Sequence, residues 1–245
     1  MNHKTPRFLD CGEAALSVEF GDVVDPEVNA RVLALDARLC AAPPQGLRET
    51  TPTYRALLVR YEPLEISRDA LVALIEGLIE IVDAEAQARQ PAVRWTVPCC
   101  YDPELAEDIG EAAAQLGCSA QSLAKSHASA EYRAYMYGFA PGWCYLGGLP
   151  QGLAIPRRVS PRGPTPPGAA LIGGALSLIA SNPMPTGWYV VGRTPERMFS
   201  LRRDPPFLVA PGDAVRFEPI DAETFRMLDA RALAGETVAR REMLS

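Results

Sequence analysis

The sequence predicts an α+β protein of two domains, an N-terminal α/β sandwich of the split βαβ type over residues 1–91 and a C-terminal β-barrel over residues 92–245. Three observations support this fold class. The first part of the chain alternates short strand patterns with amphipathic helix patterns. After Tyr135 proline and glycine become frequent and helical periodicity vanishes. Short apolar runs then recur between turns, which is typical of a barrel or sandwich.

Within the N-terminal part, ALSVEF alternates apolar and polar residues and predicts a strand. A helix follows from Pro26, with Asp25 as its N-cap. GLRETTPTYRALLVRYEP predicts two strands, and residues 68–88 predict a second amphipathic helix capped by Ser67. RWTVPCCY is either the last strand of this domain or the link to the next one.

Residues 102–134 have a helical pattern, with a turn at Gly117. The barrel strands are expected in the apolar runs AALIGGALSLIA, GWYVVGRT and PFLVAPGDAVRFEPI. The tail DAETFRMLDARALAGE predicts a closing helix. No internal repeat and no low-complexity tract interrupts this order.

Composition and charge exclude several classes of function. The formal net charge is −6 and the basic residues form no long block, which argues against nucleic-acid binding and against an anionic membrane surface. The sequence shows no secretory signal and no apolar run long enough to span a membrane. Six cysteines without a C-x-x-C pair, together with only two histidines, predict reduced thiols, a cytoplasmic location and no zinc site.

The stretch YMYGFAPGWCYLGGLP, residues 135–150, combines five aromatic residues with four glycines and carries no charge. Its glycines allow close approach of a partner, and each of its tyrosines combines an apolar ring with a hydrogen-bonding hydroxyl. Two interpretations are open: an aromatic corner that seals one end of a barrel, or one wall of a cleft for a small planar ligand. In the second interpretation Tyr135, Phe139 and Tyr145 contact the ligand.

The segment IPRRVSPRGPTPPG places Arg157, Arg158 and Arg162 between prolines that stiffen the backbone. Three fixed guanidinium groups form a suitable clamp for a carboxylate, phosphate or carbamate. The alternative is a solvated basic loop. Further along, Arg193 ends the strand GWYVVGR, where it either points into the mouth of the barrel or pairs with an acid.

No residue pattern in the chain amounts to a complete catalytic site. The sequence lacks a P-loop, a G-x-S-x-G elbow, a dinucleotide fingerprint and a metal-ligand cluster. His127 lies on a predicted helix and is interpreted as structural. Cys144 has no second histidine in the barrel half to activate it. The catalytic residues therefore stay unassigned, and the sequence favours one component of a larger enzyme, with a site that another chain completes.

Several motifs together resemble one known family. YMYGFAPGWCYLGGLP, PRRVSPR, GWYVVGRTPERMF and PFLVAPGDAVRFEPI are similar to the family called allophanate hydrolase subunit 1 or the 5-oxoprolinase B-type subunit. LSVEFGDVVDPEVNARV and TYRALLVRY extend the similarity over nearly the whole chain. The resemblance implies an N-terminal α/β domain followed by a cyclophilin-like β-barrel.

The resemblance implies three functions, which fold alone does not separate. The first is the B-type subunit of a heteromeric 5-oxoprolinase, a hydrolase that works with a C-type and an A-type subunit and opens 5-oxoproline to glutamate with ATP. The second is an inhibitor that binds the dimerisation domain of a histidine kinase. The third is a carboxyltransferase component of a biotin-dependent enzyme similar to urea carboxylase. ATP is expected in the assembled complex, and no cofactor is predicted for this chain alone.

Under the first function, the substrate is a small amide or carboxylate that lies between the aromatic stretch and the arginine-rich segment. The three arginines of that segment hold its anionic group. Tyr135 and Tyr145 orient a carbonyl or a ring nitrogen, and Arg193 closes the mouth of the barrel.

One departure from the family bears on the substrate. Relatives carry a stretch similar to G-I-A-G-x-Q-T-G-I-Y-P, and here residues 171–181 read LIGGALSLIAS. Leu176 replaces the glutamine and Ala180 replaces the tyrosine. Because a site built around an amide and a phenol depends on both groups, their loss predicts either a more apolar substrate or a binding role.

Overall fold

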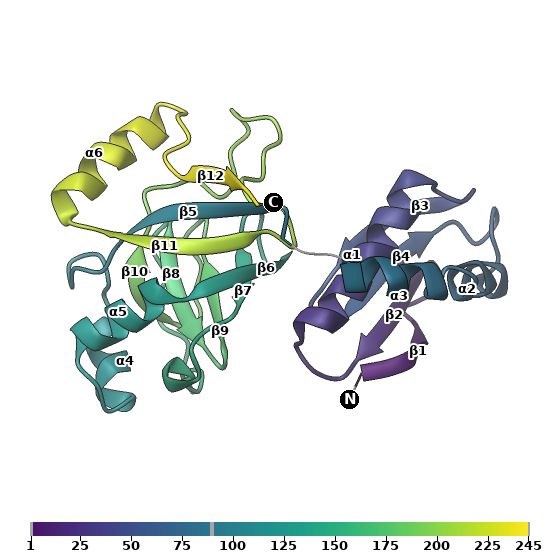
Figure 1. The fold of residues 1–245 in the computed structure, drawn as a ribbon, viewed down its shortest axis with the longest axis horizontal. Coiled ribbons are helices and arrows are strands. Elements are labelled where there is room, and N and C mark those ends of the chain that lie inside the picture. The colour runs from purple at the N-terminus through teal and green to yellow at the C-terminus, as the bar shows by residue number, and fades with distance from the viewer. Residues whose placement is uncertain (1, 89–90, 245) are drawn as a thin grey trace. The chain divides into compact units, whose positions relative to one another are not determined.

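The computed structural model describes residues 2–88 and 91–244, and these fall into two units, one on each side of residues 89–90. Figure 1 labels the elements of both units. The N-terminal unit contains β1 (Asn2–Asp10), β2 (Ala15–Gly21), α1 (Pro26–Ala41), β3 (Leu47–Pro52), β4 (Ala56–Tyr61), α2 (Arg68–Glu76) and α3 (Ile79–Ala88).

The N-terminal sheet has the strand order β1-β2-β4-β3. Both β2 and β3 run antiparallel to β4, so β4 lies between two mutually parallel strands that α1 connects. This is the split βαβ arrangement, and it confirms the predicted fold class of this unit. The fourth strand is β1, which pairs with β2; RWTVPCCY instead belongs to the barrel.

The first helix begins where its sequence predicts. The side chain of Asp25 accepts hydrogen bonds from the backbone N–H groups of Glu27 and Val28 at 2.8 and 3.1 Å. Residues 68–88, predicted as one helix, form two helices, α2 and α3. The N–H of Gly77 closes α2 on Ala73 and the N–H of Leu78 bonds to Ile75. Glycine has low helix propensity, which explains a break at this point.

The C-terminal unit holds the other elements: β5 (Val93–Cys100), α4 (Ile109–Gln115), α5 (Ala120–Ser129), β6 (Glu131–Tyr137), β7 (Cys144–Gly147), a 3-10 turn at Gln151–Leu153, β8 (Ala169–Gly173), β9 (Leu176–Ile179), β10 (Tyr189–Arg193), β11 (Ala214–Ile220), α6 (Ala222–Leu233) and β12 (Arg240–Met243). The sheet order β10-β8-β9-β7-β6-β11-β5 closes on itself through the pair Arg193–Cys100, and β12 extends it beside β5. The predicted barrel is therefore confirmed.

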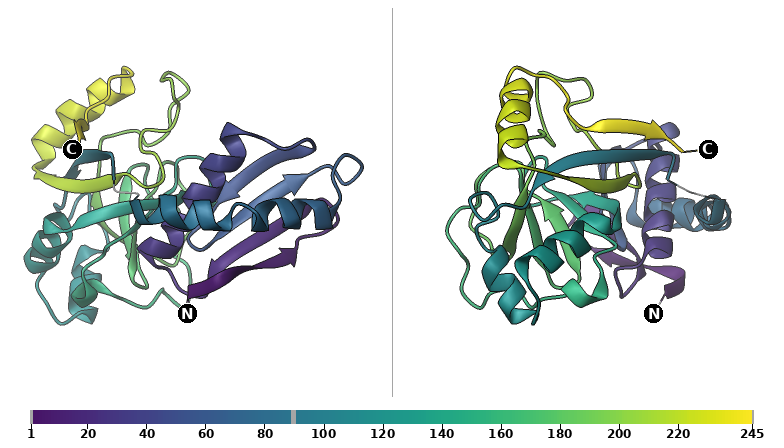
Figure 2. Two further views of the ribbon diagram at one scale, coloured as in Figure 1. Left: turned by 45° about the vertical axis from the view of Figure 1, so that its right-hand side comes forward. Right: turned by 60° about the vertical axis from the view of Figure 1, so that its left-hand side comes forward.

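The interior of the barrel is filled by alternate residues of its strands, among them Trp95, Tyr132, Cys144, Ile179 and Phe217. Tyr132 and Ala134 point inward from β6. This explains why the helix prediction for 102–134 is wrong at its end. The buried alternation places Glu131–Tyr137 in a strand, and only α4 and α5 are helical. Both helices pack together and contact the barrel (Figure 2).

Candidate functional site on the outer face of the barrel

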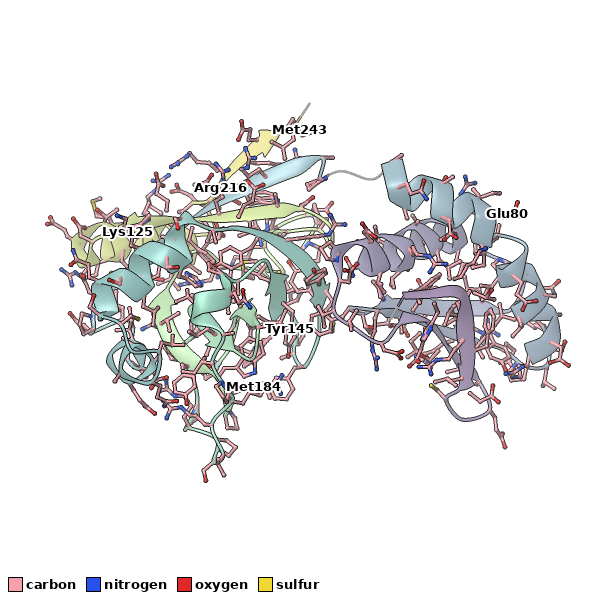
Figure 3. The ribbon with its side chains drawn as sticks, turned by 60° about the horizontal axis from the view of Figure 1, so that its bottom comes forward. Glu80, Lys125, Tyr145, Met184, Arg216 and Met243 are labelled. Atoms are coloured by element: carbon pink, nitrogen blue, oxygen red, sulfur yellow. The ribbon has the colours of Figure 1, made fainter. Side chains whose placement is uncertain are left out.

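Beside the residues that fill the barrel, a second apolar cluster covers the outer face of β7, β9, β8 and β10. The register pairs Tyr145 with Leu178, Leu178 with Leu171 and Leu171 with Val190, while their neighbours Cys144, Ile179 and Ala170 point inward. The members of this outer-face cluster are Trp143, Ala169, Leu171, Leu178, Ala180, Trp188 and Val190, with Ala140, Tyr145, Leu176 and Met184 partly exposed on it. Figure 3 labels Tyr145 and Met184.

The aromatic stretch contributes two different surfaces. Phe139 is 64% exposed, has a φ of 68°, and lies edge-on to Trp143 with the ring centroids 5.0 Å apart. Trp143 is buried, and its indole N–H donates to Oδ1 of Asn182 at 2.9 Å. A positive φ at a bulky residue is uncommon and is held here by the surrounding loop. The loop thus anchors one indole and presents one exposed phenyl ring.

The two tyrosines predicted to touch a ligand have different surroundings. Tyr145 is half-buried on the outer-face cluster, edge-on to Trp188 with centroids 6.0 Å apart. Burial raises the pKa of Tyr145, and the charge of Arg157 opposes that shift, so the phenol stays protonated at neutral pH. Tyr135 is only 3% exposed, and its ring occupies the space that a side chain at Gly147 would need.

The three predicted clamp arginines separate in the structure, and Arg157 is the one beside the aromatic rings. Its guanidinium carbon lies 5.1 Å from the centroid of the Trp188 ring. Among the described residues it makes no hydrogen bond and no ion pair. Its donors are therefore available at the edge of the outer-face cluster, next to the hydroxyl-bearing ring of Tyr145.

Arg158 and Arg162 are engaged by carboxylates of α4 and of the segment that leads into it. Arg158 donates to both oxygens of Glu111 at 2.7 and 2.6 Å and lies 3.1 Å from Asp108. Arg162 donates to Asp108 at 2.6 Å and to Glu107. Both side chains are 18% exposed. This network fixes the proline-rich segment against the barrel, and it positions Arg157 rather than adding two more free guanidinium groups.

Arg193 lies at the end of β10, where the barrel closes. Its Nε donates to the carbonyl of Pro167 at 3.0 Å, and its guanidinium carbon is 5.7 Å from the centroid of the Phe225 ring. These contacts tie β10 to the loop before β8 and to α6. No acid pairs with Arg193 among the described residues, and its predicted role at the barrel mouth stays a prediction.

Trp188 was not predicted from the sequence, and it joins the two predicted groups by contacting both Tyr145 and Arg157. A signal was present, because the Gly187-Trp188 pair precedes a strand and places an indole on the face opposite to Tyr189. The structure thus brings Tyr145 and Arg157 together through Trp188, with Phe139 nearby over Trp143. Tyr135 is buried in the packing of β6 against β7, away from the solvent that a ligand would displace.

The residues that depart from the family pattern fall on this same face. Leu176 is partly exposed on the outer-face cluster, and Ala180 is buried within it. The two positions where the family resemblance predicts an amide and a phenol are therefore apolar here. Ser177 points to the other side, where its hydroxyl donates to the carbonyl of Leu171 at 3.0 Å.

His127 is fully buried in a hydrogen-bonded chain that reaches the barrel interior. Tyr101 Oη lies 2.9 Å from its Nδ1, and Ser177 Oγ lies 3.1 Å from its Nε2. Because the Ser177 hydroxyl donates to Leu171, Nε2–H must be the donor to Ser177 and Nδ1 must accept from Tyr101. This histidine is a neutral structural element and is not exposed to a ligand, as the sequence predicts.

Burial lowers the pKa of His127 from 6.5 to about 3. Below its ordinary pKa the unfolded chain binds a proton that the folded chain does not, so stability falls as the pH falls, by about 1.4 kcal/mol per pH unit. We expect the stability difference between wild type and His127→Gln to shrink by about 2 kcal/mol from about pH 7 to about pH 5. Urea denaturation of both proteins at each pH measures this. A difference that does not change with pH would contradict the buried neutral state.

Cys144, the other candidate considered from sequence, is buried at the start of β7. Burial raises the pKa of its thiol to about 12, so it is not a thiolate at neutral pH. Within residues 2–88 and 91–244 no group of three histidine, cysteine or acidic side chains is placed to hold a metal ion. No helix in that same part of the chain is long and apolar enough to cross a bilayer.

Comparison with known proteins agrees with this fold. A family model described as carboxyltransferase domain, subdomain C and D, matches residues 6–209. The B-type subunit of 5-oxoprolinase from Bacillus subtilis (strain 168) is 30% identical over 223 residues, which cover 87% of this chain and 92% of that protein. The B-type subunit of 5-oxoprolinase from Escherichia coli O157:H7 is 32% identical over 210 residues, covering 85% of this chain and 93% of that protein.

Two solved structures with the same fold belong to larger proteins. The crystal structure of TTHA0988 superposes with a TM-score of 0.74 at 34% identity, covering 85% of this chain, which spans only 40% of that protein. The urea carboxylase of Kluyveromyces lactis superposes with a TM-score of 0.77 over all of this chain and 24% of its own, but at 17% identity it shows the fold alone. The chain therefore belongs to the carboxyltransferase-domain family of subdomains C and D, in the group whose curated relatives are named as the B-type subunit of 5-oxoprolinase.

Proposed function

We propose that this chain is the B-type subunit of a heteromeric, ATP-dependent 5-oxoprolinase in the cytoplasm, which opens 5-oxoproline to glutamate. The observation that carries the proposal is the similarity to two curated relatives of that name over more than nine-tenths of their length. The outer-face cluster is compatible with this substrate class. It offers one available guanidinium at Arg157 for a carboxylate and one protonated phenol at Tyr145 for a carbonyl or ring nitrogen.

In this proposal the chain positions the substrate and a partner protein supplies the catalytic groups. His127 and Cys144 are buried and not ionised at neutral pH, so neither acts as a base or a nucleophile. Because the chain has no P-loop, we assign ATP to the assembled complex with C-type and A-type partner subunits. Leu176 and Ala180 make the proposed substrate face more apolar than the family pattern predicts.

Co-purification with the candidate C-type partner, followed by an assay of 5-oxoproline-dependent ATP hydrolysis with the A-type partner, tests the proposal. We expect a stable complex with turnover. A stable complex without turnover would instead indicate another amide or a carboxylation substrate, as in the urea-carboxylase alternative. Absence of any complex would contradict the enzyme proposal and favour a binding protein of the kinase-inhibitor type.

A further inference from the structure

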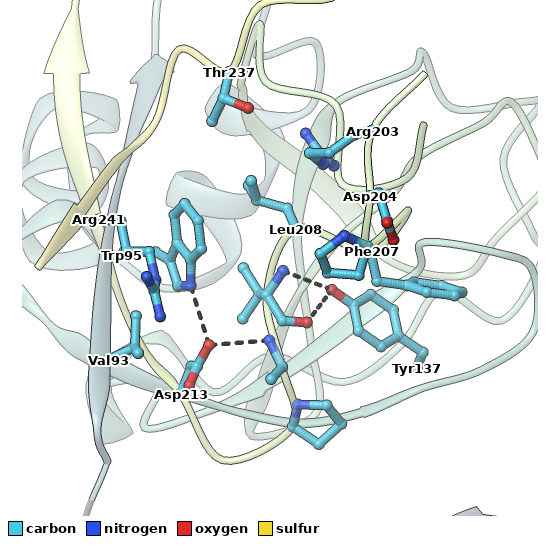
Figure 4. Close-up of a pocket in the computed structure, with 14 residues that line it drawn as sticks. Val93, Trp95, Tyr137, Arg203, Asp204, Phe207, Leu208, Asp213, Thr237 and Arg241 are labelled. Atoms are coloured by element: carbon cyan, nitrogen blue, oxygen red, sulfur yellow. Dashed lines mark hydrogen bonds between the residues drawn. The ribbon is translucent and has the colours of Figure 1, made fainter. Parts of the chain in front are cut away.

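The barrel carries a pocket of about 630 Å³ that shares no residue with the outer-face cluster (Figure 4). It lies between the start of β5, the end of β6, the loops on either side of Leu208 and the strand β12. Its lining includes Trp95, Tyr137, Phe207, Leu208, Asp213 and Arg241. A volume of this size is in the range of small-molecule sites.

The apolar wall of the pocket is held in place by hydrogen bonds that use up its polar atoms. The indole N–H of Trp95 and the backbone N–H of Ala210 both donate to Oδ2 of Asp213 at 3.0 Å. The hydroxyl of Tyr137 donates to the carbonyl of Val209 at 2.7 Å. Figure 4 draws these bonds as dashed lines between the lining residues. The wall is therefore preformed. It presents aromatic and aliphatic carbon atoms to the cavity rather than unpaired hydrogen-bond donors.

Of the two arginines at the pocket, Arg203 has both terminal nitrogens engaged, and Arg241 is available. Arg203 donates to the carbonyl of Arg197 at 2.7 Å and lies 3.5 Å from the buried carboxylate of Glu196. Arg241 is exposed and has no hydrogen-bond or ion-pair partner within the described part of the chain. It stands opposite Trp95 in the antiparallel pair of β12 and β5, so both side chains project to the same side of the sheet.

Neither carboxylate of the lining forms an ion pair with Arg241. Asp213 is held by Trp95 and Ala210, and Asp204 lies at the opposite end of the cavity from Arg241 (Figure 4). The neighbouring arginine of β12, Arg240, is paired with Glu218 at 2.7 and 2.9 Å. A guanidinium without a direct partner among the described residues therefore borders an apolar wall that contains an indole face.

We propose that this pocket binds a small organic carboxylate with a flat apolar body. The carboxylate pairs with the guanidinium of Arg241, and the body lies on Trp95, Leu208 and the ring of Phe207. An inorganic anion would leave the apolar wall in water, and a neutral apolar molecule would leave Arg241 unused. The site is distinct from the one assigned to 5-oxoproline, so an experiment that contradicts one of the two proposals does not contradict the other.

Isothermal titration calorimetry with naphthoate as the probe tests the site, with uncharged naphthamide as the matched ligand. We expect naphthoate to bind at one site, and Arg241→Gln to weaken it by about 10-fold. Naphthamide should bind about 10-fold more weakly than naphthoate and should not respond to Arg241→Gln. Arg226→Gln, an exposed arginine on α6 outside the pocket, is the control and should leave naphthoate binding unchanged.

A second variant fixes the location. Ala210 is exposed in the lining, and Ala210→Trp should fill the cavity and abolish naphthoate binding while the melting temperature is retained. Failure of naphthoate to bind the wild type at millimolar concentration would overturn the proposal. Equal affinity for naphthamide, or undiminished binding to Ala210→Trp, would overturn it as well, because the first result removes the role of the charge and the second removes the site.

Discussion

Arg157→Ala should reduce kcat/KM of the assembled complex for 5-oxoproline by about 10²-fold, since a hydrogen bond to a charged group contributes about 1.5–3 kcal/mol. The reason lies in the partners of the three neighbouring arginines. Arg158 and Arg162 are bonded to carboxylates, while Arg157 has no carboxylate partner among the described residues and lies beside Tyr145 and Trp188. It is the guanidinium in this segment that a substrate carboxylate can engage. Steady-state assays of the reconstituted complex measure the effect.

The same substitution should leave the fold unchanged. Arg157 is exposed, and its contact with the Trp188 ring is worth about 0.5–1 kcal/mol at such a site. The melting temperature and the co-purification with the C-type partner should therefore match the wild type. Arg226→Ala, which removes an exposed arginine from α6, is the matched control and should retain full turnover. Full turnover by Arg157→Ala would show that the outer-face cluster does not hold the substrate carboxylate.

Glu196→Ala should destabilise the C-terminal unit by about 3–5 kcal/mol, because it leaves several buried donors without an acceptor. The Glu196 side chain is fully buried. It accepts from the backbone N–H of Arg197 at 2.8 Å and from those of Val238 and Ala239 at 2.7 Å each. It also faces Arg203. This carboxylate thus ties the loop after β10 to the segment that leads into β12.

Urea denaturation followed by tryptophan fluorescence measures this loss. Trp95, Trp143 and Trp188 are the three tryptophans of the chain, and all lie in the C-terminal unit, so the signal reports that unit alone. Glu236→Ala removes an exposed glutamate that pairs with Arg231, and it should cost about 0.5 kcal/mol or less. If Glu196→Ala were no more costly than this control, the carboxylate would not be what holds the C-terminal segment to the barrel.

Local chemistry explains which elements were predictable. The cap at Asp25 and the alternation in β2 and β4 depend on neighbours within a few residues, and both are found as expected. The strand β1 and the end of the helical region before β6 were missed. Both depend on pairing with distant residues: β1 lies against β2, and Tyr132 of β6 is turned into the barrel core. Single-sequence periodicity does not contain such pairings.

The sequence by itself determined the two-part α+β architecture, the family and the residue types gathered at the outer face. This is possible because helix caps, hydrophobic periodicity and short motifs depend on residues that are close together in the sequence. Only the tertiary structure decided which arginine is available. Arg157, Arg158 and Arg241 carry the same side chain and the same charge. Whether the N–H donors of each are available to a ligand depends on whether the fold brings a carboxylate next to it. Asp108 and Glu111 reach Arg158 across about fifty residues of sequence, while no described carboxylate pairs with Arg157 or Arg241.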